Sequence, residues 1–220
     1  GIVRHSQNWI GPSGCTLAEA TFVPPPPSEV PAALSAWERF LHHEDDIPLL
    51  IKTGLAHAQF ETIHPFLDGN GRLGRLLITF LLCERGALAK PLLYLSFYFK
   101  NHRTEYYDRL QEIRNTGNWE AWLLFFLQGI TAVSTLATET ARRIVSLRER
   151  HRYLITDQFG RTAGNGHRVL ESLYKRPIVS INEVRELTGV SYPAAGALIN
   201  RMVEHNILSE ITGRRRNRRF

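Results

Sequence analysis

The sequence predicts a mostly α-helical protein with a short β-hairpin at its N-terminus and a small second unit at its C-terminus. Three observations support this prediction. Four consecutive prolines at 24–27 separate a short β-type segment from the rest of the chain. Apolar residues then recur at helical spacing from residue 31 to about 152, with no strand signal between them. Near residue 157 a stretch rich in Gly, Asn and Asp marks a boundary.

The elements of the first unit follow from local patterns. β-branched and aromatic residues around 3–10 and 20–23 flank a Gly/Pro/Ser turn at 11–14, which predicts a hairpin over about 1–23. The core of this unit should cover about 31–152 within a domain of residues 1–155. Its helical patterns lie at residues 34–41, 50–60, 73–81, 101–114, 119–135 and 136–152.

The second unit, residues 160–220, has three helical patterns and one strand pattern, at 167–174, 180–189, 191–206 and 207–211. Ser180 and Glu183 have the spacing of a capping box at the start of the second helix. A basic run at 214–219 follows the strand pattern. Three short helices and a basic ribbon are typical of a winged helix-turn-helix domain.

Composition restricts the compartment. Hydrophobic residues make up 43% and charged residues 22% of the chain, which is ordinary for a soluble protein. We expect no membrane span, because no apolar run reaches about 18 residues. The N-terminal GIVRHSQNWIG lacks the layout of a secretory signal and an initiator methionine, which predicts a trimmed chain. Only Cys15 and Cys83 are present, so we expect a reducing, cytoplasmic location.

The net charge of +6 is confined to the C-terminal unit. Residues 1–160 hold 16 Lys and Arg against 16 Asp and Glu, whereas residues 161–220 hold 11 against 5. This asymmetry favours a DNA or protein partner at the second unit. A solvated tail is the alternative interpretation.

The segment from His64 to Arg75 has the features of a phosphate-transfer site. Residues 69–71 (Gly-Asn-Gly) precede an apolar helix, and their N–H groups can converge on an anion at the helix N-terminus. Arg72 and Arg75 follow on the same side of the first turns. Asp68 could hold a Mg²⁺ that bridges phosphate oxygens. His64 could accept the proton of an incoming hydroxyl.

This segment, HPFLDGNGRLGR, resembles the Fic motif HPFx(D/E)GNGRxxR at every consensus position. The segments QNWIG, FVPPPP, EYYDRLQEIR and GNWEAWLLFFLQGI also resemble bacterial Fic proteins, so the similarity covers residues 1–150. The resemblance implies a Fic-type helical bundle and a protein adenylyltransferase with ATP as substrate and Mg²⁺ as cofactor. Such an enzyme transfers AMP to a Ser, Thr or Tyr hydroxyl and releases pyrophosphate.

The resemblance also implies roles for individual residues. His64 would be the catalytic base and Asp68 the metal ligand. The implied nucleotide-binding residues are Gly69, Asn70, Gly71, Arg72, Gly74, Arg75, Tyr106 and Tyr107. The N-terminal hairpin resembles the flap that docks a target protein by strand addition. AutoAMPylation and a homodimer are further partner relations that the resemblance allows.

Several alternatives stay open at this point. The donor could be a nucleotide other than ATP, or the chain could be a DNA-binding regulator with a Fic sensor domain. A Doc-type kinase is disfavoured because Gly71 stands where such relatives carry lysine. A zinc site from His57, Glu61 and His64, or a Gly-rich loop that merely caps a core helix, would be non-nucleotide explanations. The inhibitory motif [S/T]xxxE[G/N] has only a partial match, at 135–139. In proteins of this layout the inhibitory helix usually lies upstream of the flap, so we expect it to have been removed from this chain or never to have been present.

Overall fold

The structure, a computed structural model, describes residues 2–214 and 216–220. Contacts divide the chain into two compact units, Gly1–Thr138 and Glu139–Phe220. The division lies inside α6 (Trp119–Gln158), earlier than the expected boundary at 155–160. The reason is that Ile155, at the end of α6, and Phe159 belong to the apolar core of the second unit.

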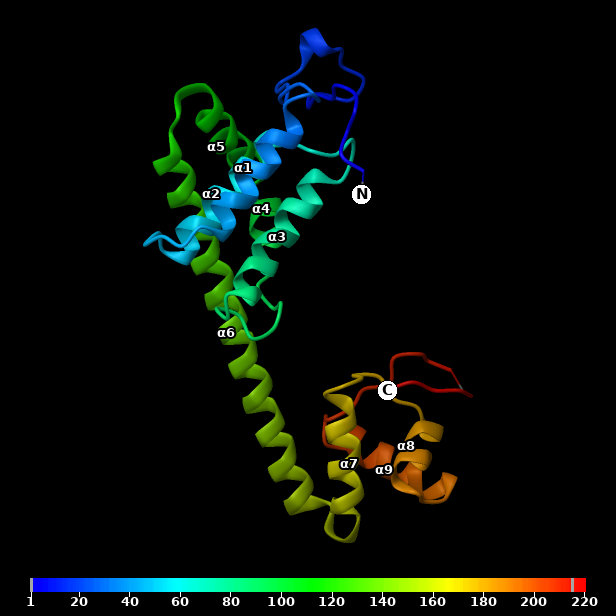
Figure 1. Cartoon of the computed structure of the whole chain (residues 1–220). Coiled ribbons are helices and arrows are strands. Elements are labelled where there is room, and N and C mark those ends of the chain that lie inside the picture. The colour runs from blue at the N-terminus through cyan, green and yellow to red at the C-terminus, as the bar shows by residue number, and fades with distance from the viewer. Residues whose placement is uncertain (1, 215) are drawn as a thin grey trace. The chain divides into compact units, whose positions relative to one another are not determined.

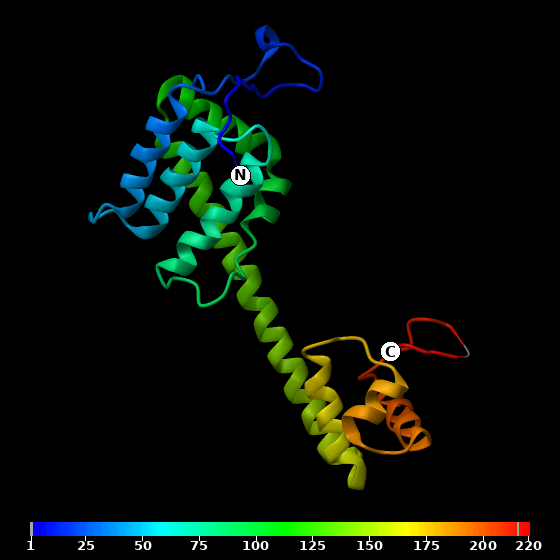
Figure 2. The same ribbon diagram turned by 45° about the vertical axis from the view of Figure 1, so that its right-hand side comes forward.

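Helices make up the first unit, and α1 packs on α2 and α2 on α3 (Figures 1 and 2). Before α6, this unit contains η1 (Leu17–Glu19), α1 (Val30–His42), α2 (Leu49–Ile63), α3 (Asn70–Glu84), α4 (Leu95–Asn101) and α5 (Arg103–Thr116). The two helices expected at 119–135 and 136–152 are one continuous helix, because no glycine or proline interrupts residues 130–158.

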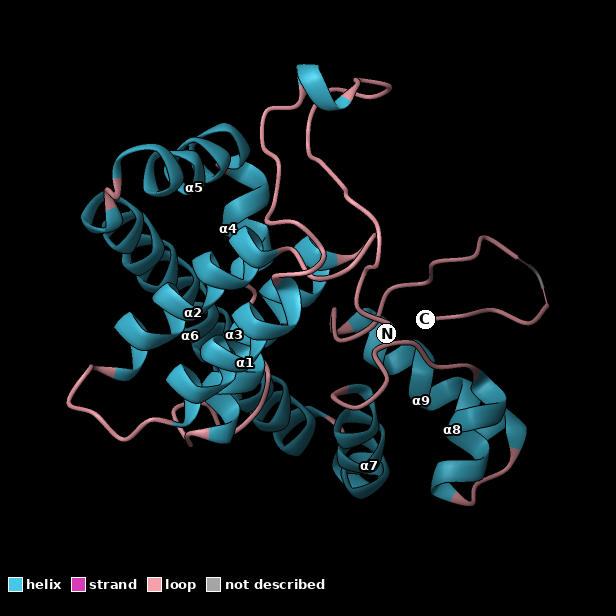
Figure 3. Ribbon diagram, turned by 45° about the horizontal axis from the view of Figure 1, so that its top comes forward, coloured by secondary structure: helices cyan, strands magenta, loops and turns pink. Residues whose placement is uncertain are grey.

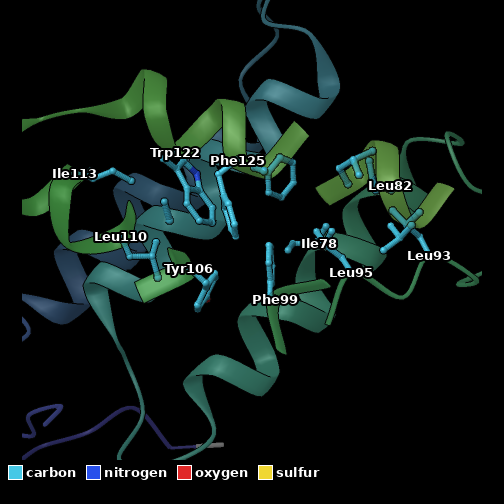
Figure 4. Close-up of a cluster of buried hydrophobic side chains, with 14 residues drawn as sticks. Ile78, Leu82, Leu93, Leu95, Phe99, Tyr106, Leu110, Ile113, Trp122 and Phe125 are labelled. Atoms are coloured by element: carbon cyan, nitrogen blue, oxygen red, sulfur yellow. The ribbon is translucent and has the colours of Figure 1, made fainter. Parts of the chain in front are cut away.

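Aromatic side chains from α4, α5 and α6 form the centre of the first core (Figure 4). Trp122 is fully buried, and its indole N–H donates to the carbonyl of Gly54 at 2.9 Å. Phe99 packs against both Trp122 and Tyr106, with ring centroids 6.3 and 4.6 Å away. Each fully buried aromatic of this size contributes about 2 kcal/mol or more to folding. The cluster therefore gives α5 a rigid support at the edge of the site described below.

One helix, α6, is long and apolar enough to cross a membrane by length and composition, with a mean hydropathy of 1.5 in its most apolar window. Only 28% of that window is buried. Trp122, Phe125, Phe126, Ile130 and Val133 of this helix nevertheless lie in the first core. Core helices of soluble proteins can have the same length and composition, so these two properties alone do not assign α6 to a membrane.

The N-terminal segment is a loop with one short helical turn, η1, and not the expected β-hairpin (Figure 3). Residues 2–29 hold a single antiparallel bridge, in which Ile10 and Phe22 exchange backbone hydrogen bonds of 2.9 and 3.0 Å. Polar side chains fasten this segment to carbonyls that are distant in the sequence. Gln7 donates to the carbonyl of Pro24, and Asn8 donates to that of Phe66, each at 2.9 Å.

The second unit contains η2 (Gly160–Thr162), α7 (Ala163–Leu173), α8 (Ile181–Thr188) and α9 (Tyr192–Glu204). The expected capping box is present, since Ser180 accepts from the Glu183 N–H and the Glu183 carboxylate accepts from Ser180. The end of the same helix at Gly189 is also as expected, with φ of 74°. The core of this unit is built from α7, α8 and α9 together with Leu208 and Phe220.

The expected strand at 207–211 does not form, and the part of the chain that the structure describes contains no strand. The last two residues of the chain form a few backbone hydrogen bonds with the segments around Val179 and Ile211. Ile211 donates to the carbonyl of Arg219 at 2.9 Å, and Val179 and Phe220 exchange hydrogen bonds of 2.8 and 2.9 Å. Isolated bridges of this kind do not establish a winged helix-turn-helix.

Candidate active site

His64 follows directly on α2 and has left-handed backbone angles, φ 48° and ψ 61°. This conformation costs energy for any residue other than glycine, and it reverses the chain sharply. Pro65 comes next and disfavours continuation of the helix. The turn thus ends α2 at His64 and leads the chain toward the start of α3 at Asn70.

The surroundings of His64 favour the neutral imidazole. The pKa of His64 is lowered from 6.5 to about 4, mainly by burial and in addition by the nearby guanidinium groups of Arg114 and Arg4. The backbone carbonyl of Glu61 lies near the ring and acts to raise the pKa of His64. The buried Nδ1 atom of His64 nevertheless has no well-formed hydrogen bond. The ring is therefore uncharged at neutral pH and able to accept a proton.

Residues 66–70 form a turn that Asn70 closes with its side chain. Its Oδ1 atom accepts from the Phe66 N–H at 2.9 Å, and its Nδ2 atom donates to the Phe66 carbonyl at 2.7 Å. Asn70 is only 1% exposed. Sequence reasoning assigned Asn70 to the phosphate-binding backbone, but its side chain has this second task of shaping the loop.

The N-terminus of α3 has the geometry expected of an anion site. Gly69 is its N-cap with φ of 86°, a conformation that glycine adopts at no steric cost. The N–H groups of the first turn have no acceptor within the helix and carry the positive end of the helix dipole.

The two other glycines of the motif allow close packing. A Cβ on Gly71 would lie 3.1 Å from an Nη atom of Arg75, and one on Gly74 would lie 2.4 Å from the Oε1 atom of Glu61. Gly74 is buried and faces α2. Gly74 thus allows α3 to approach α2 closely. The resemblance had instead implied that Gly74 contacts the nucleotide.

Charged side chains surround the start of α3. Arg72 and Asp68 form an ion pair of 3.0 Å in which both side chains are largely exposed. Such exposed pairs are weak, so each partner can exchange the other for a ligand of opposite charge. Arg75, one turn further, is partly buried and reaches a pocket beside α4 and α5.

That pocket has a volume of about 410 Å³ and brings together Arg75 and the two tyrosines identified in the sequence. Its lining is Arg75, Ser96, Phe99, Lys100, Arg103, Tyr106 and Tyr107. Tyr106 is 2% exposed, whereas Tyr107 is 47% exposed. Adjacent helical residues cannot share one face, and Tyr107 is the one with a ring free to stack on a base. Sequence reasoning missed Lys100 and Arg103, which follow no motif.

A buried polar layer lies beneath α3. The Nδ1–H group of His57 donates to the Gly74 carbonyl at 2.9 Å, and the Nε2 atom of the neutral ring accepts from the Tyr106 hydroxyl at 3.0 Å. Burial lowers the pKa of His57 to about 4 and raises that of Glu61 to about 7. Because both nitrogens of His57 are occupied, the alternative zinc site with Glu61 and His64 is not formed. Among residues 2–214 and 216–220, no three His, Cys, Asp or Glu side chains lie close enough together to hold a metal ion.

Asp68 fits the single protein carboxylate that a Mg²⁺ bound mainly through phosphates requires. Its side chain is 92% exposed, and it forms an ion pair with Arg72, whose side chain is 75% exposed. The residues present are thus compatible with a Mg²⁺–nucleotide complex.

Comparisons with known proteins agree with this geometry. The model of the Fic/DOC family matches residues 2–82, which include the loop, α2 and the whole motif. A probable protein adenylyltransferase from Aquifex aeolicus (strain VF5) is 40% identical over 100 residues, which are 46% of this chain and 29% of that protein. A protein adenylyltransferase Fic from Culex quinquefasciatus is 34% identical over 127 residues, or 57% of this chain and 22% of that protein.

The fold has a solved relative as well. The crystal structure of a Fic family protein from Desulfovibrio desulfuricans G20 covers 99% of this chain with a TM-score of 0.57 at 20% identity. The match takes in 61% of that protein. This likeness supports the fold. The chain spans less than a third of the length of the two curated relatives described above.

Proposed function

Because residues 2–82 of this chain form a Fic/DOC family domain, we propose that the chain is a protein adenylyltransferase that uses ATP. The observation that supports this most strongly is the arrangement of the motif. A neutral imidazole, His64, stands at the turn that leads into the glycine-rich start of α3. A pocket with one arginine of the motif and an accessible tyrosine, Tyr107, lies beside it.

In the proposed reaction, a hydroxyl oxygen of the target protein attacks the α-phosphorus of ATP. A new bond forms between that oxygen and phosphorus, the bond from phosphorus to the β-bridging oxygen breaks, and pyrophosphate leaves. His64 takes the hydroxyl proton. The first-turn N–H groups of α3 and the guanidinium of Arg75 stabilise the phosphate charge.

Asp68 would hold a Mg²⁺ ion, which when bound neutralises phosphate charge. Arg72, released from its exposed pair with Asp68, would then be free to contact phosphate. The adenine base would stack on Tyr107, with Arg103 placed 5.8 Å from the same ring.

The target protein would dock at the N-terminal loop, residues 2–25. The loop is fastened beside the motif, because Asn8 binds Phe66 and Phe22 stacks on Arg114 at 3.5 Å. An extended peptide laid along this loop would bring a hydroxyl to His64.

The proposal is tested by incubating the protein with Mg²⁺ and α-labelled ATP, with and without a cell lysate. We expect label on protein with the wild type and none with His64→Ala. His42→Ala, which changes a histidine at the end of α1 away from the motif, is the matched control and should transfer at the wild-type rate. Equal transfer by the His64→Ala protein would contradict the proposed mechanism.

A further inference from the structure

The C-terminal end of α2 is an unusual point of the fold, because it must hold His64 in the left-handed conformation. The last carbonyls of a helix have no partner within it and carry the negative end of the helix dipole. A chain reversal at a non-glycine residue adds to this cost. Something outside α2 has to satisfy these carbonyls and fix the turn.

Arg4, in the N-terminal loop, does so. Its Nε atom donates to the His64 carbonyl at 2.9 Å, and its backbone N–H donates to the Pro65 carbonyl at 2.9 Å. A terminal nitrogen also contacts the Ile63 carbonyl at 3.5 Å. The guanidinium therefore bonds to the residue before His64 and to His64 itself, and the peptide N–H holds the residue after it.

The same guanidinium also ties the loop to itself. It donates to the carbonyl of Pro25, in the proline run, and to that of Ser6 at 3.4 Å. Arg4 is only 2% exposed, and it has no carboxylate partner among the described residues. Because this buried arginine binds only carbonyls, peptide dipoles offset the cost of removing its charge from water. Its planar guanidinium can donate to several acceptors at once.

A second arginine contacts the same helix end from another side. Arg114 of α5 donates to the Glu61 carbonyl at 3.2 Å and to the Thr62 hydroxyl at 3.4 Å. The charged groups that act on His64 are therefore Arg114 from α5 and Arg4 from the loop, whereas Glu61 of α2 acts on it through its backbone carbonyl. Of the two arginines, Arg4 is the one that binds the His64 peptide itself.

We propose that Arg4 is a positioning residue for His64. It fixes the left-handed turn from which the imidazole projects, and it fastens the target-docking loop to the backbone of the catalytic base. This inference rests on the proposed function, since it assigns Arg4 to the transfer reaction. It predicts that the reaction is sensitive to Arg4 even though this side chain touches neither nucleotide nor target hydroxyl.

The test compares Arg4→Gln and Arg4→Lys with Arg39→Gln, which changes an exposed arginine of α1. We expect Arg4→Gln to lower kcat by about 10–100-fold while the KM for ATP stays within about twofold, because a misplaced base slows the chemical step without weakening phosphate binding. Arg4→Lys keeps the charge but loses the fork, so its kcat should be intermediate. Arg39→Gln should match the wild type.

Two further readouts separate positioning from general stability. The acid limb of kcat/KM should move to higher pH in Arg4→Gln, and an NMR titration should show the His64 pKa rising toward 6.5. The NMR titration needs no activity, so it tests the role of Arg4 even if the wild type transfers no AMP and the proposed function fails. If Arg4→Gln does not fold, Arg4→Lys is measured in the same way. An unchanged kcat, or an unchanged His64 titration, in the folded variants would overturn the inference.

Discussion

At the scale of single residues, the proposed activity of this chain depends on the protonation of His64. Burial and two nearby arginines, Arg114 and Arg4, lower the pKa of His64 to about 4 in the free protein. The neutral form therefore prevails above that pH and is lost only as the pH falls toward 4. An exposed histidine would lose its basic form already near pH 6.5.

This difference is measurable in the pH profile. We expect kcat/KM for ATP to stay level as the pH falls from 8 to about 5, because kcat/KM reports ionisations of the free enzyme. Steady-state rates with a folded sample, checked by circular dichroism at each pH, provide the measurement. A fall with a midpoint near 6.5 would show that His64 is exposed in solution.

Glu61 should make the stability of the protein depend on pH. Burial raises its pKa from 4.5 to about 7, so the folded state keeps the proton while the unfolded state loses it. The stability associated with the bound proton is complete below pH 4.5 and is lost as the pH rises through 7. Glu61→Gln stays neutral at every pH. We expect its loss of unfolding free energy between pH 5 and 8 to be smaller than that of the wild type by about 2 kcal/mol.

Urea denaturation at the two pH values measures this difference. Glu38→Gln, on α1 and outside the site, serves as the control and should follow the wild type. Identical pH dependence in the Glu61→Gln protein would mean that Glu61 is charged and solvated in the folded state.

The two tyrosines should respond differently to mutation. Tyr107→Ala removes an exposed ring from the pocket and is expected to raise the KM for ATP about tenfold, with little effect on stability. Tyr106→Phe removes the hydroxyl that bonds to buried His57 and should cost about 1–3 kcal/mol of stability. Kinetics and thermal unfolding of both variants test this assignment, and a reversal of the two effects would exchange their roles.

At the scale of elements, the close contact of α2 and α3 sets the position of the motif. Gly74 is the closest point, since a Cβ there would lie 2.4 Å from Glu61 and 3.2 Å from His57. Gly74→Ala should therefore destabilise the protein by about 1–3 kcal/mol and lower transfer activity. Gly196→Ala, in the middle of α9 where a Cβ has room, should instead stabilise by up to about 1 kcal/mol. Equal stability of the two variants, measured by thermal unfolding, would contradict this packing.

Local signals predicted the helices well. The capping box at Ser180 begins α8 and the glycine at 189 ends it where expected, because capping depends on neighbours in the chain. The hairpin prediction failed for the opposite reason. Its backbone is held by side chains such as Asn8, whose acceptor, Phe66, is distant in sequence and leaves no local pattern.

The same limit applied to the site. The twelve residues from His64 to Arg75 carry their chemistry in their order and spacing, so the sequence alone is enough to identify them. Arg4, Arg114 and Lys100 could not be found in this way, because each reaches the site from another element and belongs to no periodic pattern. The double role of Asn70 depends on the turn that it closes, which its place in the motif does not reveal.

At the scale of the whole molecule, two compact units share α6 but have separate cores. The proposed chemistry lies in the first, and the excess positive charge lies in the second. Arg214 and Arg216 are exposed at the C-terminal segment. We expect Arg214→Ala with Arg216→Ala to weaken any binding of duplex DNA and to reduce its salt dependence, while AMP transfer is unchanged.

Fluorescence anisotropy with labelled duplexes at several salt concentrations, together with the transfer assay, checks this separation. If the wild type does not bind DNA, the basic segment is better explained as a solvated tail or as a site for a protein partner of the second unit. A loss of AMP transfer in the double variant would show that the two units act together.

The central claim is that this chain transfers the adenylate part of ATP to protein hydroxyls with His64 as base. It is tested most directly by parallel reactions with α-labelled and γ-labelled ATP in the presence of Mg²⁺. The account predicts label on protein from α-labelled ATP alone, and none with His64→Ala. Label on protein from γ-labelled ATP, or transfer that survives the loss of His64, would contradict it.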